Sequence, residues 1–260
     1  MKHIVMFSGG LGSWMTGKIV AERYGTEDLI LLFADTLIED EDLYRFLDEG
    51  AANVGAELTR IAEGRDPWQV FFDTRFLGNS RVGNCSKILK REFIRKWIEE
   101  RYKPDDCIMY LGIDGMESHR HERAARWWEP YKIVSPLCEA PFISYGQIKE
   151  RLKAEGIRIP RLYELGFAHN NCGGFCVRSG QGQFEHLLKV MPERYAHHEA
   201  KEKELREYLD ADVAILRDRT GGTVKPLPLT EFRKRLAAKD PQLNLLEWGG
   251  CSCLVGDLED

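Results

Sequence analysis

The segment that most constrains this chain is a glycine turn near its N-terminus, with the sequence SGGLGS at residues 8–13. An apolar run at residues 4–7 precedes it, and residues 14–24 have helical character. Glycine lets a backbone turn tightly and approach a ligand, and amides at a helix start attract anions. The pattern predicts a strand, a phosphate-binding turn and a helix; a purely structural turn is the alternative. The candidate phosphate-binding residues are Ser8, Gly9, Gly10, Gly12 and Ser13.

Two common nucleotide motifs do not fit this turn. The P-loop needs a Lys-Ser/Thr pair after its second glycine, and the dinucleotide fingerprint needs the spacing G-x-G-x-x-G. The turn instead resembles the SGGxDS loop of PP-loop ATP pyrophosphatases, which cleave ATP between the α- and β-phosphates. One difference is plain, because Gly12 stands where that loop carries an acidic residue. The resemblance implies ATP and Mg²⁺ as ligands.

Length and charge limit the class of protein. A chain of 260 residues suits one large α/β domain, or a core domain with an appendage. The net charge of −5 argues against broad nonspecific nucleic-acid binding but leaves a local basic groove open. No apolar run approaches the ~20 residues that span a bilayer, and the N-terminus enters a strand directly, so we expect no signal peptide. We therefore expect a cytoplasmic protein without a membrane segment.

Strands and helices alternate in the first part of the chain. Strands are expected at residues 4–7, 29–34, 57–62, 106–113 and 132–136, the last at a sheet edge, with helices at 14–24, 39–54, 67–72 and 84–102. This alternation predicts a doubly wound, mostly parallel α/β sheet, in which ligands gather at the carboxyl ends of the strands. Asp35 and Thr36 end the second strand, where they would hold a ribose or a metal ion, or cap the following helix.

Basic residues follow in two places. Arg120 and Arg123 come after the fourth strand, where arginine forks would bind phosphate; an exposed, charged helix start is the alternative. The helix at 84–102 carries cations that form either a local anion patch for substrate or a solvated surface. These cations are Lys87, Lys90, Arg91 and Arg95.

From residue 144 the chain becomes helical and polar. Helices are expected at 145–155, 182–190, 193–209 and 229–238, and a hairpin between 213–217 and 223–225. We predict a nucleotide-binding α/β domain at residues 1–143 and a smaller, mainly helical C-terminal subdomain at 144–260 that bears cysteines.

Two cysteine pairs lie in glycine-rich segments of this second part. Cys172 and Cys176 form one pair, and Cys251 and Cys253 form the other. Seven cysteines in a reducing compartment do not suggest disulfides. Four thiolates suit a tetrahedral zinc or an iron–sulfur cluster. For Cys107 and Cys138 we expect buried, unliganded thiols.

Further segments resemble adenylyl-sulfate reductases. IPRLYELGF at 159–167, followed by Cys172 and Cys176, resembles the family's PLY-x-x-G-[YF]…C-x-x-C segment. GIDGMES at 112–118, with the two arginines that follow, resembles GIR-x-x-ES-x-x-R, and Cys85 resembles a remnant of the family's CC-x-x-(R)K helix start. Cys251 and Cys253 stand where the family carries a catalytic cysteine. The chain departs from the family in its phosphate loop, its single cysteine at 85 and its C-x₃-C spacing.

The chain thus resembles the phosphoadenosine phosphosulfate reductase-like branch of the PP-loop superfamily, which has the adenine nucleotide alpha-hydrolase-like fold. The resemblance implies adenylation of a substrate with release of pyrophosphate, for sulfur transfer or thiolation, as in the ATP-using enzymes implicated in sulfur insertion into nucleic acid. The implied catalytic residues are Ser13, Arg120, Arg123 and Cys253. Further implied nucleotide contacts are Gly112, Asp114 and Glu117, and Cys85 is an implied substrate or cluster contact.

The implied cofactors are ATP, Mg²⁺ and a [4Fe-4S] cluster, with zinc as the alternative. A sulfur-donor protein such as a cysteine desulfurase, a nucleic-acid substrate and a second copy of the chain are the partners that remain open. A reductase or sulfotransferase acting on a sulfonucleotide, with Cys251 or Cys253 as nucleophile, is an alternative function. A noncatalytic nucleotide-binding module, favoured by Gly12, is another.

Overall fold

The structure is a computed structural model that describes residues 1–79 and 82–249. Its centre is a five-stranded sheet in which neighbouring strands are parallel and the order is β3-β2-β1-β4-β5. The strands are β1 (Lys2–Met6), β2 (Leu29–Asp35), β3 (Glu57–Ala62), β4 (Cys107–Tyr110) and β5 (Lys132–Val134). The predicted α/β class is confirmed, and β5 lies at an edge as expected.

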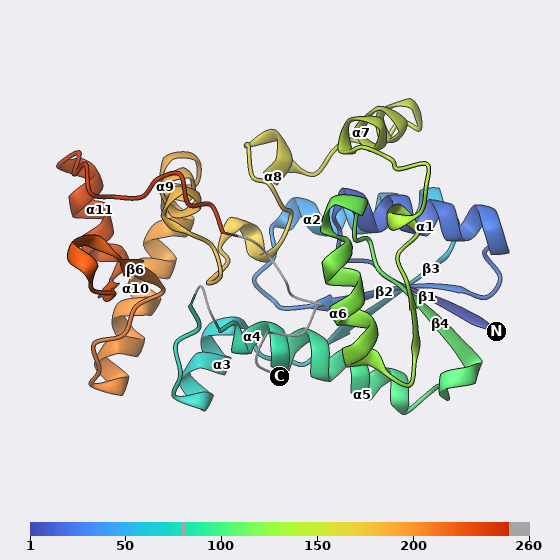
Figure 1. Ribbon diagram of the computed structural model, residues 1–260, viewed down its shortest axis with the longest axis horizontal. Coiled ribbons are helices and arrows are strands. Elements are labelled where there is room, and N and C mark those ends of the chain that lie inside the picture. Colours follow the sequence, from blue (N-terminus) through green and yellow to red (C-terminus); the bar gives the residue numbers. More distant parts are fainter. Residues whose placement is uncertain (80–81, 250–260) are drawn as a thin grey trace.

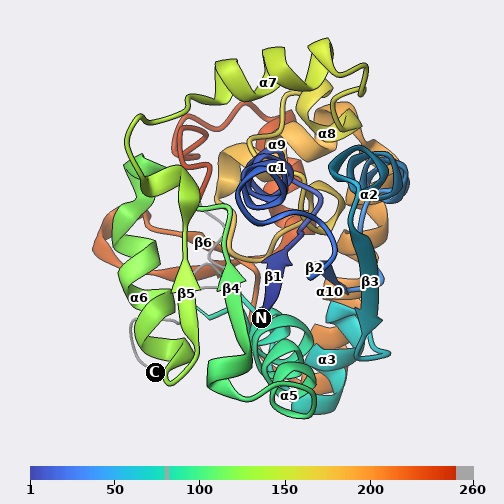
Figure 2. The ribbon, with the colours of Figure 1, turned by 90° about the vertical axis from the view of Figure 1, so that its right-hand side faces the viewer.

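Helices cover both faces of this sheet (Figures 1 and 2). One face packs against α1 (Leu11–Tyr24), α2 (Glu41–Val54) and α7 (Tyr145–Ala154). The other packs against α5 (Phe93–Glu99) and α6 (Ser118–Trp128). Successive side chains of a strand point to opposite faces, so a strand covered on both sides is apolar throughout. This is why β1 and β2 appear in the sequence as unbroken apolar runs.

The order of the strands reverses between β1 and β4. From β1 the chain moves outward through β2 and β3, and the later strands β4 and β5 extend the sheet on the opposite side. In such sheets the loops after the two diverging strands separate and leave a crevice at the carboxyl ends, where ligands bind. The glycine turn follows β1, and residues 111–117 follow β4. The fold therefore places the two predicted nucleotide-binding segments on either side of this crevice.

The expected helix at residues 84–102 is not one continuous α-helix. It consists of α4 (Asn84–Ser86), a π-helical stretch (Lys87–Glu92) and α5, which ends at Glu99. A π-helical turn holds more residues than an α-helical turn, so it rotates the following side chains relative to an α-helical pattern. Lys90 and Arg91 are buried. The expectation of one continuous α-helix is therefore wrong for this segment, and the solvated-surface alternative is wrong for these two residues.

The N-terminus of α2 also differs from the expectation. Asp40 is the N-cap residue, and its carboxylate accepts a hydrogen bond from the Asp42 amide. The N-cap residue Asp40 lies four residues beyond Thr36. Neither Asp35 nor Thr36 therefore caps this helix.

The C-terminal part is mainly helical, as predicted. It contains α8 (Arg161–Glu164), α9 (Gln181–Val190), α10 (Pro192–Leu209) and α11 (Leu229–Ala237). The expected hairpin is confirmed as an antiparallel pair. Its strands are β6 (Leu216–Asp218) and β7 (Lys225–Leu227).

Apolar packing crosses the predicted boundary at residues 143/144 in both directions. Trp68 and Phe71 of α3 (Pro67–Thr74) belong to the C-terminal cluster of buried side chains, together with Phe175 and Phe184. The helix α7 packs on the sheet instead. The domain boundary at 143/144 stays a prediction. Buried apolar side chains from the two sides of this boundary pack together. Among the described residues, no helix combines the length and apolarity that a membrane crossing needs.

Candidate functional site

The glycine turn lines a pocket of about 120 Å³ at the crevice between β1 and β4. The pocket brings together eight residues that the sequence singled out, which are Ser8, Gly10, Gly12, Ser13, Lys90, Gly112, Glu117 and Arg120. Tyr145, Tyr163, His169, Asn170 and Asn171 of the later part of the chain also line it. We call it the nucleotide pocket below, after the ligand that its loop predicts.

The turn has a geometry that suits an anion. Gly9 has a φ of +76°, a conformation that L side chains rarely adopt. Gly10 takes the N-cap position of α1, and glycine has no side chain that could cover the helix amides. Ser13 donates a hydrogen bond to the Gly10 carbonyl at 2.8 Å, and the Ser8 and Ser13 hydroxyl oxygens lie 3.4 Å apart. Amides and two hydroxyl groups thus surround one side of the pocket.

Gly12 lies against the backbone of the loop after β4. A Cβ atom at Gly12 would lie 2.8 Å from the Gly112 carbonyl oxygen, and a Cβ atom at Gly112 would lie 2.6 Å from the Gly12 carbonyl carbon. Both distances are shorter than real Cβ atoms show, and the neighbours are backbone atoms that cannot swing away. The absence of an acidic side chain at position 12 therefore has a steric reason, since two main chains meet here directly.

Two residues of the C-terminal part reach back to the turn. The Tyr163 hydroxyl accepts a hydrogen bond of 3.5 Å from the Leu11 amide, and Asn170 Nδ2 donates to the Gly9 carbonyl at 2.8 Å. Burial raises the pKa of the Tyr163 phenol above its ordinary value, so the hydroxyl stays neutral. The segment around Tyr163 carries part of the family resemblance, but the sequence predicted no role for Tyr163 or Asn170. The pairing of Asn170 with a backbone carbonyl has no signal in the sequence.

The amide of Asn170 presents an unsatisfied acceptor. The side chain is 1% exposed, and within the described parts of the chain its Oδ1 has no hydrogen-bond partner. The contact from Nδ2 to the Gly9 carbonyl determines which amide atom is the acceptor. Buried polar atoms are nearly always paired. A hydrogen-bond donor on a ligand or a water molecule in the pocket would supply the missing partner.

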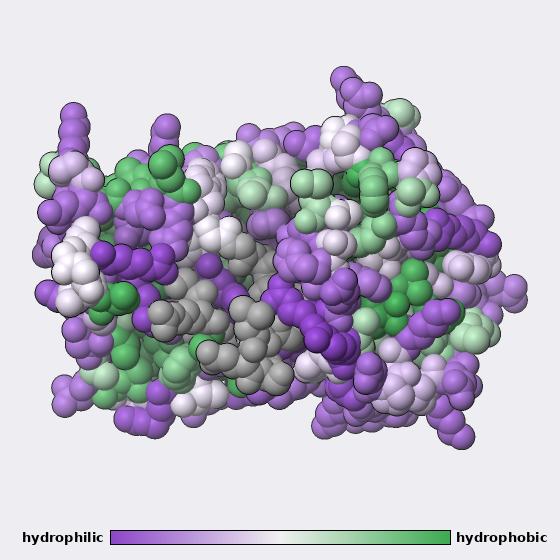
Figure 3. All heavy atoms as spheres, in the orientation of Figure 1, coloured by the Kyte–Doolittle hydropathy of each residue, from purple (hydrophilic) through white to green (hydrophobic). Residues whose placement is uncertain are grey.

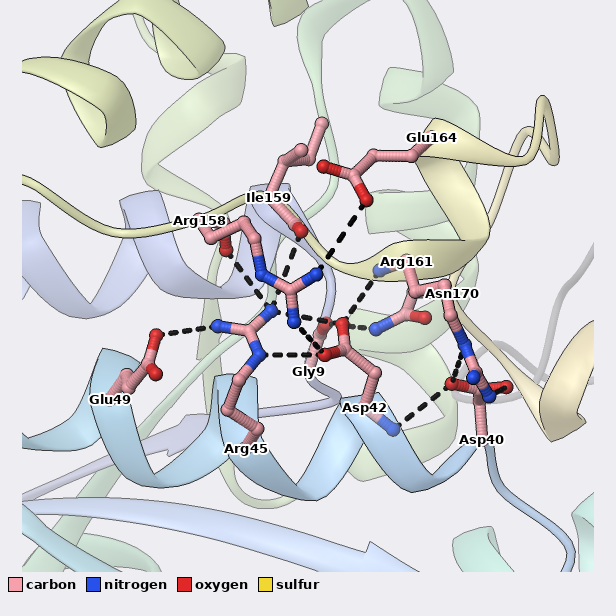
Figure 4. A network of polar contacts seen from close by, with 10 residues as sticks. All are labelled: Gly9, Asp40, Asp42, Arg45, Glu49, Arg158, Ile159, Arg161, Glu164 and Asn170. Atoms are coloured by element: carbon pink, nitrogen blue, oxygen red, sulfur yellow. Dashed lines mark hydrogen bonds and ion pairs between the residues drawn. The ribbon is translucent and has the colours of Figure 1, made fainter.

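Charged groups at the start of α2 hold this returning segment in place (Figure 4). Asp42 accepts hydrogen bonds from Arg45 at 2.7 Å, from Arg158 at 2.5 Å and from the Arg161 amide at 2.7 Å. The Arg161 guanidinium also pairs with Asp40 at 2.7 Å. The hydrogen bonds from Arg45 make the largest contribution to lowering the pKa of Asp42 to about 2. We call Asp40, Asp42, Arg45, Arg158 and Arg161 the α2 clamp.

Three cysteines line a second, much smaller pocket of about 20 Å³, which we call the cysteine pocket. They are Cys85, Cys172 and Cys176, and Thr36 lines the same pocket. Cys172 has a φ of +50°, an unusual value for a residue with a side chain. Gly173 and Gly174 continue in the same region with φ of +57° and +82°. Cys172 therefore begins a left-handed turn that needs support from elsewhere in the fold.

Glu39 and Arg194 supply that support. Glu39 accepts a hydrogen bond from the Cys172 amide at 2.5 Å. Arg194 donates to the Gly173 carbonyl at 2.8 Å and to the Ile38 carbonyl at 3.5 Å. The guanidinium fills the space beside Gly173, where a Cβ atom would lie 1.2 Å from Nη1. The loop after β2 and the helix α10 thus hold the cysteine turn between them.

Lys90 lies between the two pockets and lines both of them. Its ammonium pairs with Glu39 at 3.3 Å, and only 1% of the Glu39 side chain is exposed. Glu39 therefore contacts the cysteine turn through one carboxylate oxygen and Lys90 through the other. This buried ion pair physically connects the nucleotide pocket to the cysteine pocket.

The predicted metal site is only partly within the described residues. No group of three or more metal-ligating side chains comes together in residues 1–79 and 82–249. The three cysteines line one pocket, but within the described residues they do not converge closely enough to bind one metal ion together. Cys251 and Cys253, which complete the predicted set, lie outside the described residues.

Other predicted site residues have structural partners. Asp35 accepts hydrogen bonds from the Leu37 amide at 2.8 Å and from the Tyr44 hydroxyl at 3.0 Å, and it does not line the nucleotide pocket. Asp114 accepts from the amides of Met116 and Glu117. These carboxylates shape the loops after β2 and β4, and their predicted ligand roles stay predictions.

The basic residues do not form one patch. Arg91 is buried, with its guanidinium 5.7 Å from the centre of the Trp127 ring. Lys87 is exposed and lies 4.0 Å from Glu92, and Arg95 pairs with Glu99. Of Lys87, Lys90, Arg91 and Arg95, only Lys90 lines the nucleotide pocket. Of the two arginines of α6 that the sequence singled out, Arg120 lines this pocket and Arg123 does not.

Of the remaining two cysteines within the described residues, Cys107 is buried as expected, whereas Cys138 is only half-buried. Burial raises the pKa of the Cys107 thiol to about 11, which keeps it protonated. Cys138 donates hydrogen bonds of 3.3 Å to the carbonyls of Ile113 and Asp114. Both therefore serve the packing around β4.

No family model matches the sequence. Among curated proteins, the chain is similar to the uncharacterized protein MJ0066 of Methanocaldococcus jannaschii, with 25% identity over 209 residues that cover 80% of this chain and 42% of that protein. The chain thus spans less than half the length of this relative. Among solved structures, it is similar to the phosphoadenylyl-sulfate (PAPS) reductase from Candida auris in a phosphate complex, with a TM-score of 0.44, 15% identity and coverage of 64% of this chain and 77% of that one. Neither similarity assigns an activity to this chain.

Proposed function

We propose that this chain is a PP-loop ATP pyrophosphatase of the phosphoadenosine phosphosulfate reductase-like branch, which adenylates a substrate oxygen for sulfur transfer. The observation that carries the proposal is the nucleotide pocket itself. It joins the glycine turn, the start of α1, Arg120 and Lys90 at the carboxyl ends of β1 and β4. This is the place where a doubly wound sheet binds its ligand.

In this proposal the glycine turn holds the pyrophosphate part of ATP. The amides at the start of α1 and the hydroxyls of Ser8 and Ser13 donate to phosphate oxygens. The substrate oxygen attacks the α-phosphorus, the bond to the β-phosphate oxygen breaks, and pyrophosphate leaves with that electron pair. A sulfur nucleophile then displaces AMP from the adenylated carbon.

Arg120 is placed to stabilise the charge that develops on the phosphates. It pairs with Glu117 at 2.6 Å through Nη1, and its Nε is buried without a partner among the described residues. A phosphate oxygen would satisfy this donor. Mg²⁺ would add further neutralisation, and Glu117, the acidic residue among the described residues that line the pocket, would offer it an oxygen ligand.

The cysteine pocket would hold the sulfur chemistry. Cys85, Cys172 and Cys176 offer thiolates from one side of a single pocket, and Cys251 or Cys253 would complete a set of four. Such a set fits a [4Fe-4S] cluster or a zinc ion. A cluster would carry the sulfur to be transferred, whereas zinc would serve the structure. Lys90 would provide positive charge between the adenylated substrate and these thiolates.

The test is release of pyrophosphate from ATP by the purified, metal-loaded protein in the presence of RNA and DNA. We expect activity in the wild type and a loss of about 100-fold in Arg120→Ala. Arg126→Ala is the matched control, because Arg126 is exposed on the same helix and does not line the pocket. Sulfite formed from a sulfonucleotide without pyrophosphate would overturn the proposal. ATP binding without turnover under every substrate condition would indicate a noncatalytic module.

The identity of the cofactor is tested separately. The absorbance spectrum and metal content of anaerobically purified protein distinguish the alternatives, because a cluster is brown with about 4 irons whereas zinc is colourless with about 1 ion per chain.

A further inference from the structure

A third hollow lies in the C-terminal half, away from the sheet. It has a volume of about 380 Å³, larger than the nucleotide pocket, and lies between the loop after α3, the end of α10 and the hairpin β6–β7. Figure 1 shows these elements in the left half of the molecule, and Figure 3 shows a hydrophobic area in the lower left of that face. The apolar lining residues include Leu77, Leu209, Val213, Val224 and Pro226. Nothing in the proposed chemistry uses this hollow.

Its rim is positively charged. Arg75, Arg217 and Lys225 come from three separate segments and line the hollow together. Arg75 and Lys225 are exposed, and Arg217 is half-buried with an Nε that has no partner in the described part of the chain. The acidic lining residue, Asp212, already pairs with Arg206 at 2.9 Å. Although the net charge of the chain is −5, three cations lie around this one hollow. Their local positive charge attracts an anion.

Aromatic rings accompany these cations. Phe76 lines the hollow and is 40% exposed, an unusual state for a phenylalanine. The Arg75 guanidinium lies 4.9 Å from the centre of the Tyr208 ring, which is 50% exposed. Exposed rings beside cations suit single-stranded nucleic acid, because bases stack on the rings while phosphates contact the cations. An acidic peptide would use the cations but would leave the rings without a partner.

The hollow is close to the cysteine pocket. Leu77 lines the hollow, and the next residue, Gly78, packs against Val177, which lines the cysteine pocket. A Cβ atom at Gly78 would lie 3.0 Å from Val177 Cγ2, so the two segments are in direct contact. One layer of backbone separates the hollow from the place where we propose the sulfur chemistry.

We propose that this hollow binds the phosphodiester backbone and a base of a single-stranded nucleic acid, which is the acceptor of sulfur. The inference rests on the proposed function for what happens to the bound strand. Arg75, Arg217 and Lys225 contact phosphates, and Phe76 stacks with a base. A neighbouring nucleotide of the same strand then extends toward the cysteine pocket.

The test measures binding of fluorescently labelled single-stranded RNA and DNA of about 12 nucleotides by anisotropy between 50 and 200 mM salt. We expect the double variant Arg75→Ala/Lys225→Ala to bind at least about 10-fold more weakly. The slope of log affinity against log salt concentration should fall by about 1.4, since two phosphate contacts are lost. Phe76→Ala should weaken binding with no change in the salt slope. Lys149→Ala/Lys153→Ala is the matched control, because both lysines are exposed on α7.

Further arms identify the ligand. Inorganic phosphate and a mononucleotide should compete only weakly, whereas a polyglutamate peptide that competes as well as the oligonucleotide would overturn the proposal. Equal affinity of the wild type and the double variant would also overturn it. Pyrophosphate release from ATP is measured in parallel. Release without oligonucleotide binding contradicts this inference alone, and oligonucleotide binding without release contradicts the proposed function alone.

Discussion

The glycine turn at residues 8–13 and the cysteine turn at residues 172–174 both use left-handed backbone, but different parts of the fold support them. The glycine turn joins a strand directly to the helix that follows it, and Gly112, Tyr163 and Asn170 contact it from distant parts of the chain. The cysteine turn has no regular strand or long helix beside it in sequence. Glu39 and Arg194 hold it, and these residues are 133 and 21 positions away from their partners. The flanking β1 and α1 fix both ends of the glycine turn, whereas the cysteine turn depends more strongly on its distant contacts.

The largest effect is expected at Glu39. Replacing Glu39 with alanine removes one carboxylate that pairs with the buried Lys90 and removes the acceptor for the Cys172 amide. Removing one partner of a buried ion pair costs about 3–5 kcal/mol. Urea unfolding should show this loss, and Glu39→Gln should lose less because it keeps the acceptor oxygen. Glu41→Ala, an exposed neighbour, is the control. Equal stability of Glu39→Ala and Glu41→Ala would show that the cysteine turn does not depend on this distant contact.

The second effect concerns the glycine turn. Gly12→Asp restores the residue type of the SGGxDS loop, but its Cβ atom meets the Gly112 carbonyl. Overpacking of this kind costs about 1–3 kcal/mol, so we expect lower stability and no gain in pyrophosphate release. The control is Gly146→Ala, where a Cβ atom meets only Ser144 Oγ at 3.8 Å. A Gly12→Asp variant that is stable and more active would show that the two loops can separate.

The third effect is a dependence on pH in the α2 clamp. The pKa of Asp42 is lowered from 3.8 to about 2, with hydrogen bonds from Arg45 as the main cause. A lowered carboxylate pKa contributes stability above the unfolded pKa, and this stability is lost as the pH falls through the folded value. It amounts to at most about 2.4 kcal/mol, from 1.36 kcal/mol per pKa unit.

The corresponding measurement is the difference in unfolding free energy between the wild type and Asp42→Asn. We expect the difference to be constant above about pH 5 and to shrink between pH 4 and 2. A difference that stays constant down to pH 2 would contradict the lowered pKa of Asp42.

The smallest effect is expected at Asn170. Asn170→Ala removes both the hydrogen bond to the Gly9 carbonyl and the unsatisfied Oδ1 acceptor. One hydrogen bond to a ligand corresponds to about 1 kcal/mol, so ATP affinity should fall about 5–10-fold. Equilibrium binding of ATP checks this, and His169→Ala, which changes a neighbouring residue that lines the same pocket, is the comparison. Unchanged ATP affinity in Asn170→Ala would mean that water satisfies Oδ1.

Much of the fold could be predicted because its signals are local. The apolar runs of β1 and β2, the glycine turn and the periodicity of α7 and α9 each lie within one short window of sequence. The β6–β7 hairpin around Gly221 and Gly222 is of the same kind. The segment at Lys87–Glu92 was misread, because whether a turn closes with the α or the π hydrogen-bond pattern depends on what surrounds it.

The residues of the candidate site also differ in whether the local sequence predicts them. The residues that bind phosphate in our proposal follow from the turn and from the end of β4, and the structure brings most of them into one pocket. Tyr163 and Asn170 complete that pocket by contacts to the backbone of residues that precede them by more than 150 positions. Such contacts leave no pattern in a single sequence, because many side chains could make them.

Sequence alone was sufficient for the class of fold, for the strand–turn–helix unit around Gly9 and Gly10, and for the candidate cysteines, since backbone preferences and hydrophobic periodicity act over a few residues. The tertiary structure decided that Gly12 is a contact between two main chains, that Lys90 and Glu39 lie between two pockets, and that Arg75, Arg217 and Lys225 surround one hollow. These relations join segments far apart in the chain, and they arise only when packing of the buried core brings those segments together.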